Sequence, residues 1–597
     1  MQPYKLAIVG LGPKGLYALE HLLARLQHSD EDKEIEIHLF EKTGVFGAGE
    51  IYHPDQPDYL LMNYPNRNIN AWSGEKPKPA VPKALSFVKW LYKYKNRPTE
   101  NLEDEFASRK TVGEYLMYCF GQLVSFQNKS VTIAKHTATV IDIERIGQGL
   151  ELTFNDNGGR NVLRVQQVLL TTGHSSCRKS TKYGYDDSSS TSKSNFVPYV
   201  YPVQKKLCKI DEHATIGIKG LGLTFIDTVL AITEGRGGKF INTNSESLMY
   251  VPSGNEPRKI YAFSRSGLPM IPRNGTEGKM YYLPKYFTYD NIRNRAGISK
   301  KINFNEHILP LYIAEVQYRY YSILFHQHNL NFYPYEKISQ LNKQVDSFHE
   351  RYPDAYRLDC RDLFKPKSFD AEQSELDALA YMRYTLKEAR IGSASSAFMA
   401  AAMTWGRLSD TFNTFYSFGK MTADSQSVFD HKYRSQLNRI SYGPPVENMA
   451  KIIALVETGL VDLNYAKNPE VKEVGNRWKL SNSHTNPVEV DILIDARIPT
   501  FRSPDDWSPL LKNMQDNGLV RPFRNNDTST YEVGCPEINR QGKAIGKNGS
   551  VVHQIGIYGT PTEGMVYDND SLSRTRNNFA SRWSANVLEN SWAMEYN

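Results

Sequence analysis

Short apolar runs alternate with helical spacing at the start of the chain. Residues Tyr4–Val9 form an apolar run rich in strand-forming side chains, which predicts a buried parallel strand. Leu16–Arg25 repeats apolar side chains at helical spacing, and Ile35–Phe40 is a second apolar run after the polar turn His28–Lys33. This order of strand, helix and strand predicts a βαβ unit.

The same alternation returns further along the chain. Ala214–Lys219 predicts another strand, and a helical pattern follows it through Thr233. Two runs, Lys239–Thr243 and Leu248–Pro252, predict a hairpin, and Lys259–Phe263 predicts the next strand. The chain therefore contains a second unit of the same kind.

Helical spacing dominates from about Lys300 to Asp462, and predicts helices at 308–326, 372–391, 396–413 and 446–460. The apolar run Val490–Arg497 then predicts a strand that returns the chain to a sheet. Val551–Ile557 predicts a last strand of the first unit, with a helix from about Asn577. The polar segment Ser175–Asn195 predicts a surface excursion between the two units.

Glycines fill the turn after the first strand, in the pattern G-x-G-x-x-G. Gly10 permits the tight turn, Gly12 lets the backbone approach a pyrophosphate, and Gly15 allows close contact between helix and strand. The helix that begins near Pro13 offers free N–H groups and a positive dipole end to phosphates. Glu41, directly after the second strand, is placed to accept hydrogen bonds from ribose hydroxyls. Together these features predict a dinucleotide site.

Further turns indicate that this dinucleotide is FAD. A second glycine loop follows the ribose acid, and the tract around Asn63 is similar to a flavoprotein element that lies beside the ring system. A later strand ends in Thr172-Gly173, which resembles the turn that closes the FAD domain of flavoproteins with two dinucleotide sites. The candidate residues of the first site are Gly10, Gly12, Pro13, Gly15, Glu41, Lys42, Gly47, Gly49, Asn63, Thr172, Gly173, Gly559 and Gly564.

The second unit has its own glycine turn, Gly220-x-Gly222. Its next strand ends in Ser264-Arg265 instead of an acid, and an arginine at this point accommodates a 2′-phosphate, which favours NADPH over NADH. A surface ion pair is the alternative role for Arg265. The candidate residues of the second site are Gly220, Gly222, Leu223, Thr224, Ser264 and Arg265.

The expected fold class is therefore α/β, with two Rossmann-like dinucleotide-binding domains, for FAD and for NADPH, and a helical insertion. We expect the first part of the FAD domain at 1–205 and the NADPH domain at 206–300. The helical insertion or substrate region is expected at 301–484, and the return to the FAD domain at 485–597. One chain with both sites implies a hydride donor that feeds a flavin.

Composition argues against several classes of protein. The net charge is only +7 over 597 residues, without a basic stripe interleaved with aromatics, which argues against a nucleic-acid partner. The five cysteines form no C-x-x-C, so we expect neither a disulfide framework nor a metal site nor disulfide reductase chemistry, and a reducing, cytoplasmic compartment fits. No apolar run approaches the ~18–20 residues of a membrane span, and no signal peptide precedes the first strand.

Six stretches together resemble a bacterial FAD-NAD(P)-binding protein family. That family is similar to flavin-dependent N-hydroxylases of ornithine and lysine, and it includes the N-monooxygenases that oxidise L-aspartate to nitrosuccinate. The stretches are scattered along nearly the whole chain, at 7–16, 47–65, 233–238, 264–269, 443–460 and 559–564.

The resemblance implies a monooxygenase that N-hydroxylates an amino-acid amine through a flavin C4a-hydroperoxide, using FAD, NADPH and O2. A dicarboxylate such as aspartate favours arginine partners, and Arg67 and Arg273 are candidates because they follow cofactor-flanking segments. The catalytic base is not assigned, and a homo-oligomer is possible.

Three alternatives remain open at this point. One is an NADPH:flavin oxidoreductase that does not oxygenate its substrate. Another is a monooxygenase that attacks sulfur or a ketone, in the Baeyer–Villiger manner. The third is a non-catalytic FAD-binding protein.

Overall fold

The computed structural model describes residues 3–27, 34–74, 76–98, 100–125, 130–174, 195–243, 247–277, 279, 281–299, 301–366, 375–499 and 503–593. The predicted polar turn at 28–33 lies outside the described residues, as does nearly all of the predicted excursion at 175–195, with Cys177.

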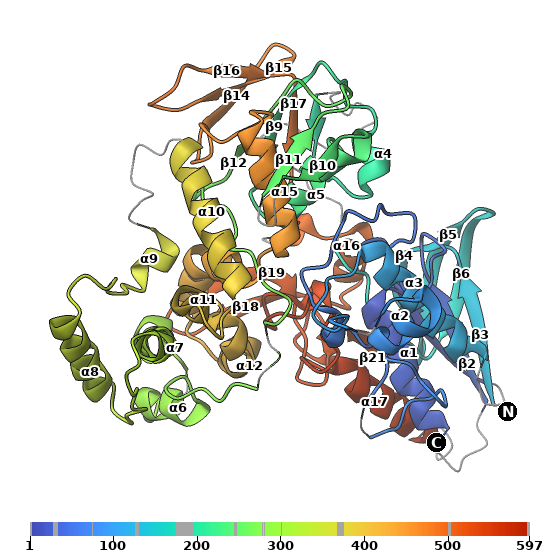
Figure 1. Cartoon of the computed structure of the whole chain (residues 1–597). Coiled ribbons are helices and arrows are strands. Elements are labelled where there is room, and N and C mark those ends of the chain that lie inside the picture. The colour runs from blue at the N-terminus through green and yellow to red at the C-terminus, as the bar shows by residue number, and fades with distance from the viewer. Residues whose placement is uncertain are drawn as a thin grey trace.

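A six-stranded sheet forms the first unit, in the order β20-β21-β7-β1-β2-β3. Its strands are β1 Tyr4–Val9, β2 Ile35–Phe40, β3 Val131–His136, β7 Gln167–Leu170, β20 Lys543–Ile545 and β21 Val551–Ile557. All neighbours are parallel except β20 and β21. Because the chain ends supply opposite sides of this sheet, the first unit is discontinuous in sequence, and the strand expected at 551–557 lies in it (Figure 1).

Helices from both chain ends cover this sheet, and the blue α1 lies beside the red α17 in Figure 1. The helices of the first unit are α1 Pro13–Leu26, α2 Phe87–Lys95, α3 Arg109–Ser125, α16 Pro509–Asp516 and α17 Phe579–Ala593, of which α2 packs against α3 and α16 against a smaller sheet. Smaller antiparallel sheets join β4 Thr139–Ile146, β5 Gly149–Asp156 and β6 Gly159–Val165, and β18 Pro522–Asn526 with β19 Thr530–Pro536. The apolar side chains of α1 and β1 are almost entirely buried, which follows from a parallel sheet covered on both faces.

A five-stranded sheet, in the order β13-β12-β9-β17-β8, forms the second unit. Its strands, all parallel to their neighbours, are β8 Phe196–Val197, β9 Thr215–Lys219, β12 Lys259–Phe263, β13 Val461–Asp462 and β17 Ile492–Asp495. Around it lie α4 Val203–Leu207, α5 Leu223–Ala231, the hairpin β10 Lys239–Asn242 and β11 Leu248–Val251, and the sheet β14 Glu470–Val474, β15 Arg477–Ser481 and β16 Val488–Val490. The hairpin prediction is confirmed.

Two of the expected domain limits need correction. The strand β17 hydrogen-bonds to β9, so the chain returns to the first sheet after residue 495 and not at 485. The short strand β8 pairs with β17, so the second unit already begins near residue 196 rather than 206. Both strands are short apolar runs, and nothing in such a run specifies which of two parallel sheets it joins.

The middle of the chain is helical, as expected. Its helices are α6 Tyr289–Ala296, α7 Leu309–Gln327, α8 Ile338–Arg351, α9 Arg361–Phe364, α10 Glu375–Ile391, α11 Ala397–Ala402, α12 Thr404–Tyr416, α13 Ala423–Val428, α14 Arg434–Ser441 and α15 Val446–Glu457. The single helix expected at 396–413 is divided at Met403. There the Thr404 hydroxyl donates to the Ala400 carbonyl at 2.9 Å, a local side-chain bond that competes with the helical ladder.

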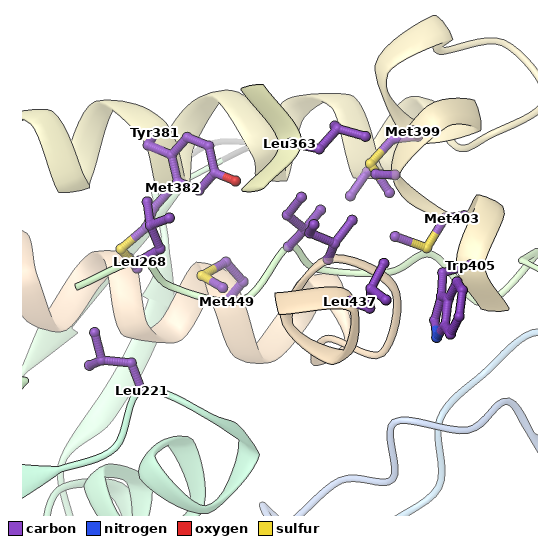
Figure 2. Packing of buried hydrophobic residues seen from close by; sticks show 14 of the residues in the cluster. Leu221, Leu268, Leu363, Tyr381, Met382, Met399, Met403, Trp405, Leu437 and Met449 are labelled. Atoms are coloured by element: carbon purple, nitrogen blue, oxygen red, sulfur yellow. The ribbon is translucent and has the colours of Figure 1, made fainter. Parts of the chain in front are cut away.

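This helical region shares one hydrophobic core with the second unit. Figure 2 shows Leu221 and Leu268 of the second unit lying near Met382 and Met449 of the helices. Methionine side chains are unbranched and fill irregular gaps between elements that meet at several angles. The helical region is therefore continuous with the second unit and does not have a core of its own.

The two units are joined by a buried ion pair. Arg109, at the start of α3, lies 2.7 Å from the Asp227 carboxylate on α5, and the Tyr201 hydroxyl also donates to Asp227. Burial raises the pKa of the Asp227 carboxyl, and the Arg109 charge opposes this effect. The pair holds the helix of the second glycine turn against the first unit.

Among the residues that the structure describes, no helix is both long enough and apolar enough to cross a membrane.

Candidate dinucleotide and substrate site

The first glycine turn joins β1 to α1 at the point where the strand order of the first sheet reverses. Gly10 has φ +92°, and a Cβ there would lie 2.6 Å from the Thr171 carbonyl oxygen. A Cβ at Gly15 would lie 2.4 Å from the Gly10 oxygen, so both glycines are required by the fold. At Gly12 the nearest atom to a Cβ would be the Gly49 Cα, at 3.8 Å. The protein alone therefore does not require a glycine at position 12, whereas a close ligand would.

Glu41 lies directly beside this turn. Its carboxylate accepts hydrogen bonds from the Leu11 N–H at 3.0 Å and from the Thr43 hydroxyl at 3.0 Å. The carboxylate is thus buried next to the glycine turn with its charge oriented by two donors. Lys42, in contrast, points outward and pairs with Glu50 at 2.8 Å.

The second glycine loop contacts the first one. The Gly47 N–H donates to the Leu11 oxygen at 2.7 Å, and Gly47 and Gly49 both have positive φ angles, +96° and +65°. Asn63 lies further along and donates to the Tyr442 carbonyl oxygen at 3.2 Å. Asn63 therefore connects the first unit to the loop after α14.

The turn that includes Thr172 and Gly173 contacts the first glycine turn, and the residue that makes this contact is Thr171. The Thr171 N–H donates to the Val9 oxygen at 2.8 Å, and its hydroxyl donates to the Gly10 oxygen. Gly173 has φ +71° and nothing within 4 Å of a Cβ position. Sequence reasoning missed Thr171 because its role depends on a contact 161 residues away.

The turn with Gly559 and Gly564 brings the C-terminal part of the chain to the start of α1. A Cβ at Gly559 would lie 3.1 Å from the Lys14 side chain, whose Nζ donates to the Ser573 oxygen at 2.8 Å. Burial lowers the pKa of Lys14 to about 7, against the opposing charge of Asp570. Lys14 is a second residue that the sequence pattern did not single out.

Glu563 lies inside the same turn and is also buried. It pairs with Arg434 at 2.7 Å, and the Asn569 N–H donates to it at 2.8 Å. Burial raises the pKa of Glu563 to about 7, Asp570 acts in the same direction, and Arg434 opposes both. This contact ties the helical region to the turn expected at the flavin.

The second glycine turn repeats the arrangement of the first. Gly220 has φ +123°, and a Cβ there would lie 2.8 Å from the Ala496 oxygen. A Cβ at Gly222 would have nothing within 4 Å. Leu223 begins α5, and Thr224 is buried in its first turn. The surrounding protein therefore requires Gly220 but not Gly222, just as it does not require Gly12 in the first unit.

Ser264 and Arg265 lie at the carboxyl end of β12, next to β9. The Ser264 hydroxyl accepts from the Gly267 N–H at 3.1 Å, and the Arg265 guanidinium donates to the Ser435 hydroxyl at 2.9 Å. The Arg265 side chain is exposed, and within the described part of the chain no acidic side chain pairs with it. Arg497 follows β17, with its Cγ 3.3 Å from a Cβ position at Gly220, and it pairs with Asp495. Sequence analysis missed this second arginine.

The structure does not favour Arg67 as a substrate residue. Its guanidinium pairs with Asp104 at 2.5 Å and donates to the carbonyl oxygens of Gly275 and Glu277, both at 2.6 Å. These partners lie 37 to 210 residues away in the chain and were not foreseeable from the sequence. Arg67 anchors the loop after Arg273.

Arg273 has a hydrogen-bond donor that the described residues leave unsatisfied. One Nη donates to the Asn63 carbonyl oxygen at 3.2 Å, but its buried Nε has no hydrogen-bond partner among the described residues. The buried hydroxyl of Tyr442 likewise has none within that part of the chain. Burial lowers the pKa of Arg273, with the nearby Glu277 carboxylate opposing it. Arg273 and Tyr442 interact electrostatically, so their unused donors lie in one region.

The residues present fit two dinucleotides. Both α1 and α5 begin after a glycine that offers no side-chain cap, and neither helix has an acidic residue in its first turn. Their first N–H groups and positive dipole ends are thus available to anions, as in known dinucleotide folds. Each turn follows the central strand of a parallel sheet, where such ligands bind. The fold class expected from the sequence is confirmed.

Comparisons with known proteins agree with this arrangement. Over 583 residues the chain is 26% identical to the nitrosuccinic acid synthase of Aspergillus oryzae, covering 94% of this chain and 88% of that protein. It is 24% identical to the L-aspartate N-monooxygenase (nitrosuccinate-forming) of Streptomyces davaonensis, with coverage of 94% and 92%.

The ornithine N-hydroxylase of Kutzneria sp. 744, a solved structure, aligns over 99% of this chain and all of that one, with 10% identity and a TM-score of 0.48. Residues 7–175 match the family described as FAD-NAD(P)-binding. The resemblance inferred from the sequence is thereby confirmed for this N-terminal part of the chain.

Proposed function

We propose that the chain is an FAD-dependent, NADPH-consuming monooxygenase that N-hydroxylates an amino-acid amine, with L-aspartate as substrate and nitrosuccinate as product. One observation carries this proposal. Two parallel sheets in one chain each present a glycine turn at the central strand, and in each turn one glycine, Gly12 or Gly222, has no explanation in protein contacts.

The first site would hold FAD and the second NADPH. Gly12 and the first turn of α1 would bind the FAD diphosphate, and Glu41 would accept from a ribose hydroxyl. Gly222 and α5 would bind the NADPH diphosphate, with Arg265 near the 2′-phosphate. When bound, FAD supplies the oxidising chemistry after reduction by NADPH and reaction with O2. The chain itself binds, orients and excludes water.

The substrate carboxylate is assigned to Arg273. The Nε of Arg273 and the hydroxyl of Tyr442 are buried donors without a partner in the described part of the chain, and such donors are costly unless a ligand satisfies them. A guanidinium matches carboxylate geometry, which suits an acidic amino acid. The two relatives named for nitrosuccinate formation, each covering 94% of this chain, support aspartate in particular.

The reacting amine must be neutral, because its lone pair attacks oxygen. An ammonium group held next to Arg273 would be disfavoured by desolvation and by like charge, which would lower its pKa. This environment would favour the neutral, reactive form of the amine, and the group that accepts its proton is not assigned. A cytoplasmic location and a homo-oligomer stay predictions from the sequence.

The test is steady-state kinetics of Arg273→Met and Tyr442→Phe with L-aspartate. We expect the KM for aspartate to rise at least tenfold for Arg273→Met, or about 1.4 kcal/mol, with a smaller rise for Tyr442→Phe. The KM for NADPH should not rise in parallel. Arg97→Met is the matched control, since Arg97 is exposed and pairs with Glu105 at the surface. Rapid NADPH oxidation that yields only H2O2 with every amine would contradict the proposal.

A further inference from the structure

A pocket of about 360 Å³ is lined by seven residues, none of which belongs to the two glycine turns. Its lining residues come from α6, from α12 and the segments next to it in the helical region, and from the loop before β20 of the first unit. Three cationic side chains line it, Arg293, Lys420 and Arg540, and none of its lining residues is acidic.

The positive charge in this pocket is not neutralised by the protein. Among the described residues, neither guanidinium, of Arg293 or of Arg540, takes part in an ion pair or a hydrogen bond. The Lys420 Nζ donates only to the Thr414 carbonyl oxygen, at 2.6 Å. Burial lowers the pKa of Lys420, and the charges of Arg540 and Arg293 lower it further. An anion placed between the three side chains would stabilise the charged form of Lys420 against this effect.

One wall of the pocket is aromatic and apolar. The rings of Tyr289 and Phe415 stack with centroids 5.0 Å apart, and the buried Ile302 lies beside them in the lining. Tyr289 is 56% exposed, so part of its ring faces solvent. The wall gives an organic group a surface next to the cations.

We propose that this pocket binds a small phosphorylated molecule through its diphosphate group. The two guanidiniums of Arg293 and Arg540 and the ammonium of Lys420 suit a group with more than one negative charge. Each guanidinium can donate two parallel hydrogen bonds to two phosphate oxygens. The pocket volume exceeds that of a simple inorganic anion, and the aromatic wall accommodates the remainder of the ligand. None of the residues that line this pocket is a candidate residue of the FAD or NADPH site, and the proposal does not rest on the proposed function.

Binding has a structural consequence. Arg293 and Lys420 belong to the helical region, whereas Arg540 belongs to the C-terminal part of the first unit. An anion held by all three therefore crosslinks two parts of the molecule. By mass action it raises the thermal stability of the folded chain.

The test is calorimetric titration with inorganic pyrophosphate, using protein with saturating FAD and NADP⁺ so that both dinucleotide sites are filled. We expect one binding event, weakened at least tenfold in the Arg293→Ala/Arg540→Ala double variant and weakened by added salt. Lys420→Gln is a second, milder variant with the same expected direction. Arg160→Ala, an exposed arginine on β6, is the matched control and should bind as the wild type does.

Three results would overturn the inference. Absence of any binding event in the filled wild-type protein excludes a diphosphate site, as does equal affinity in the wild type, the double variant and Lys420→Gln. Sulfate binding as tight as pyrophosphate binding would show a nonspecific anion site instead. ADP binding tighter than pyrophosphate would support the role assigned to the aromatic wall.

Discussion

At the scale of single residues, substitutions at Gly12 and Gly222 should affect the two cofactors separately, because no protein contact requires a glycine at either position. Gly12→Ala and Gly222→Ala add a Cβ where the fold has room, at 3.8 Å or more from any other atom. Both variants should therefore fold. Gly12→Ala should be purified with little flavin, whereas Gly222→Ala should keep its flavin and raise the KM for NADPH at least tenfold, about 1.4 kcal/mol.

Flavin absorbance and the rate of anaerobic bleaching by NADPH measure these two effects. Gly121→Ala, a helical glycine with nothing within 4 Å of its Cβ position, is the control. Equal flavin content and equal bleaching in all three variants would show that neither turn binds a dinucleotide.

Arg265 sets the predicted preference for NADPH over NADH. Because its side chain is exposed and, among the residues described, bonds only Ser435, Arg265→Ala should not disturb the fold. Loss of the guanidinium removes a charge-assisted bond to the 2′-phosphate, which NADH lacks. The ratio of kcat/KM for NADPH to that for NADH should fall about tenfold or more. An unchanged ratio would assign the 2′-phosphate to another residue, with Arg497 as the next to test.

At the scale of elements, the contact between α1 and α17 should be sensitive to acid. His21 is buried on α1, where its Nε2 meets the Asn578 amide at 3.3 Å and its Nδ1 has no partner among the described residues. Burial lowers the pKa of His21 to about 3, and Arg574 and Arg25 add to this effect. Between pH 6.5 and 3 the His21 imidazole therefore stays neutral in the folded chain, whereas in the unfolded chain it takes up a proton.

The sign of the effect follows from this difference. Since the unfolded state binds more protons, His21 lowers the stability of the fold as the pH falls below about 6.5, by at most ~1.4 kcal/mol per pH unit. His21→Gln should therefore gain in thermal midpoint relative to wild type between pH 7.5 and pH 5. His213→Gln, at a fully exposed site, is the control. A constant difference across this range would rule out the assignment.

The βαβ elements were predictable from the sequence because their signals are local. Apolar runs, the glycine at position 10 and the helical spacing after Pro13 lie within one stretch of chain, and the structure places β1, α1 and β2 there. The same holds for the strand at Lys259–Phe263. The strand at Ile492–Asp495 was predicted too, but not its place in the second sheet, since its partner β9 lies 276 residues earlier.

The candidate substrate residues show the limit of the sequence more sharply. Arg67 and Arg273 look alike in the sequence, each following a cofactor-flanking segment. The structure distinguishes them, because the Arg67 guanidinium is paired with Asp104 whereas the Nε of Arg273 is buried without a partner among the described residues. The partners of Arg67 come from distant segments of the chain, so no local sequence pattern predicts them.

At the scale of the whole molecule, the buried pair of Arg109 and Asp227 should stabilise the contact between the two units. Asp227→Asn leaves the Arg109 charge buried without its counterion, which typically costs about 3–5 kcal/mol. We expect a clearly lower urea midpoint, and slower flavin reduction by NADPH because α5 carries the second glycine turn. Asp58→Asn breaks the exposed pair with Lys110, and should cost at most ~1 kcal/mol. Similar midpoints for both variants would argue against a joining role.

The arrangement of the whole chain makes one claim central, that electrons from NADPH at the second unit lead to oxygenation of an amine at the first. Reaction with NADPH, L-aspartate and ¹⁸O2, followed by mass spectrometry, tests it most directly. The account predicts nitrosuccinate labelled on both oxygens of its nitro group, formed only when NADPH is present and in strongly reduced amount in Gly222→Ala. Consumption of NADPH with unchanged aspartate, and with all of the oxygen recovered as labelled H2O2, would contradict it.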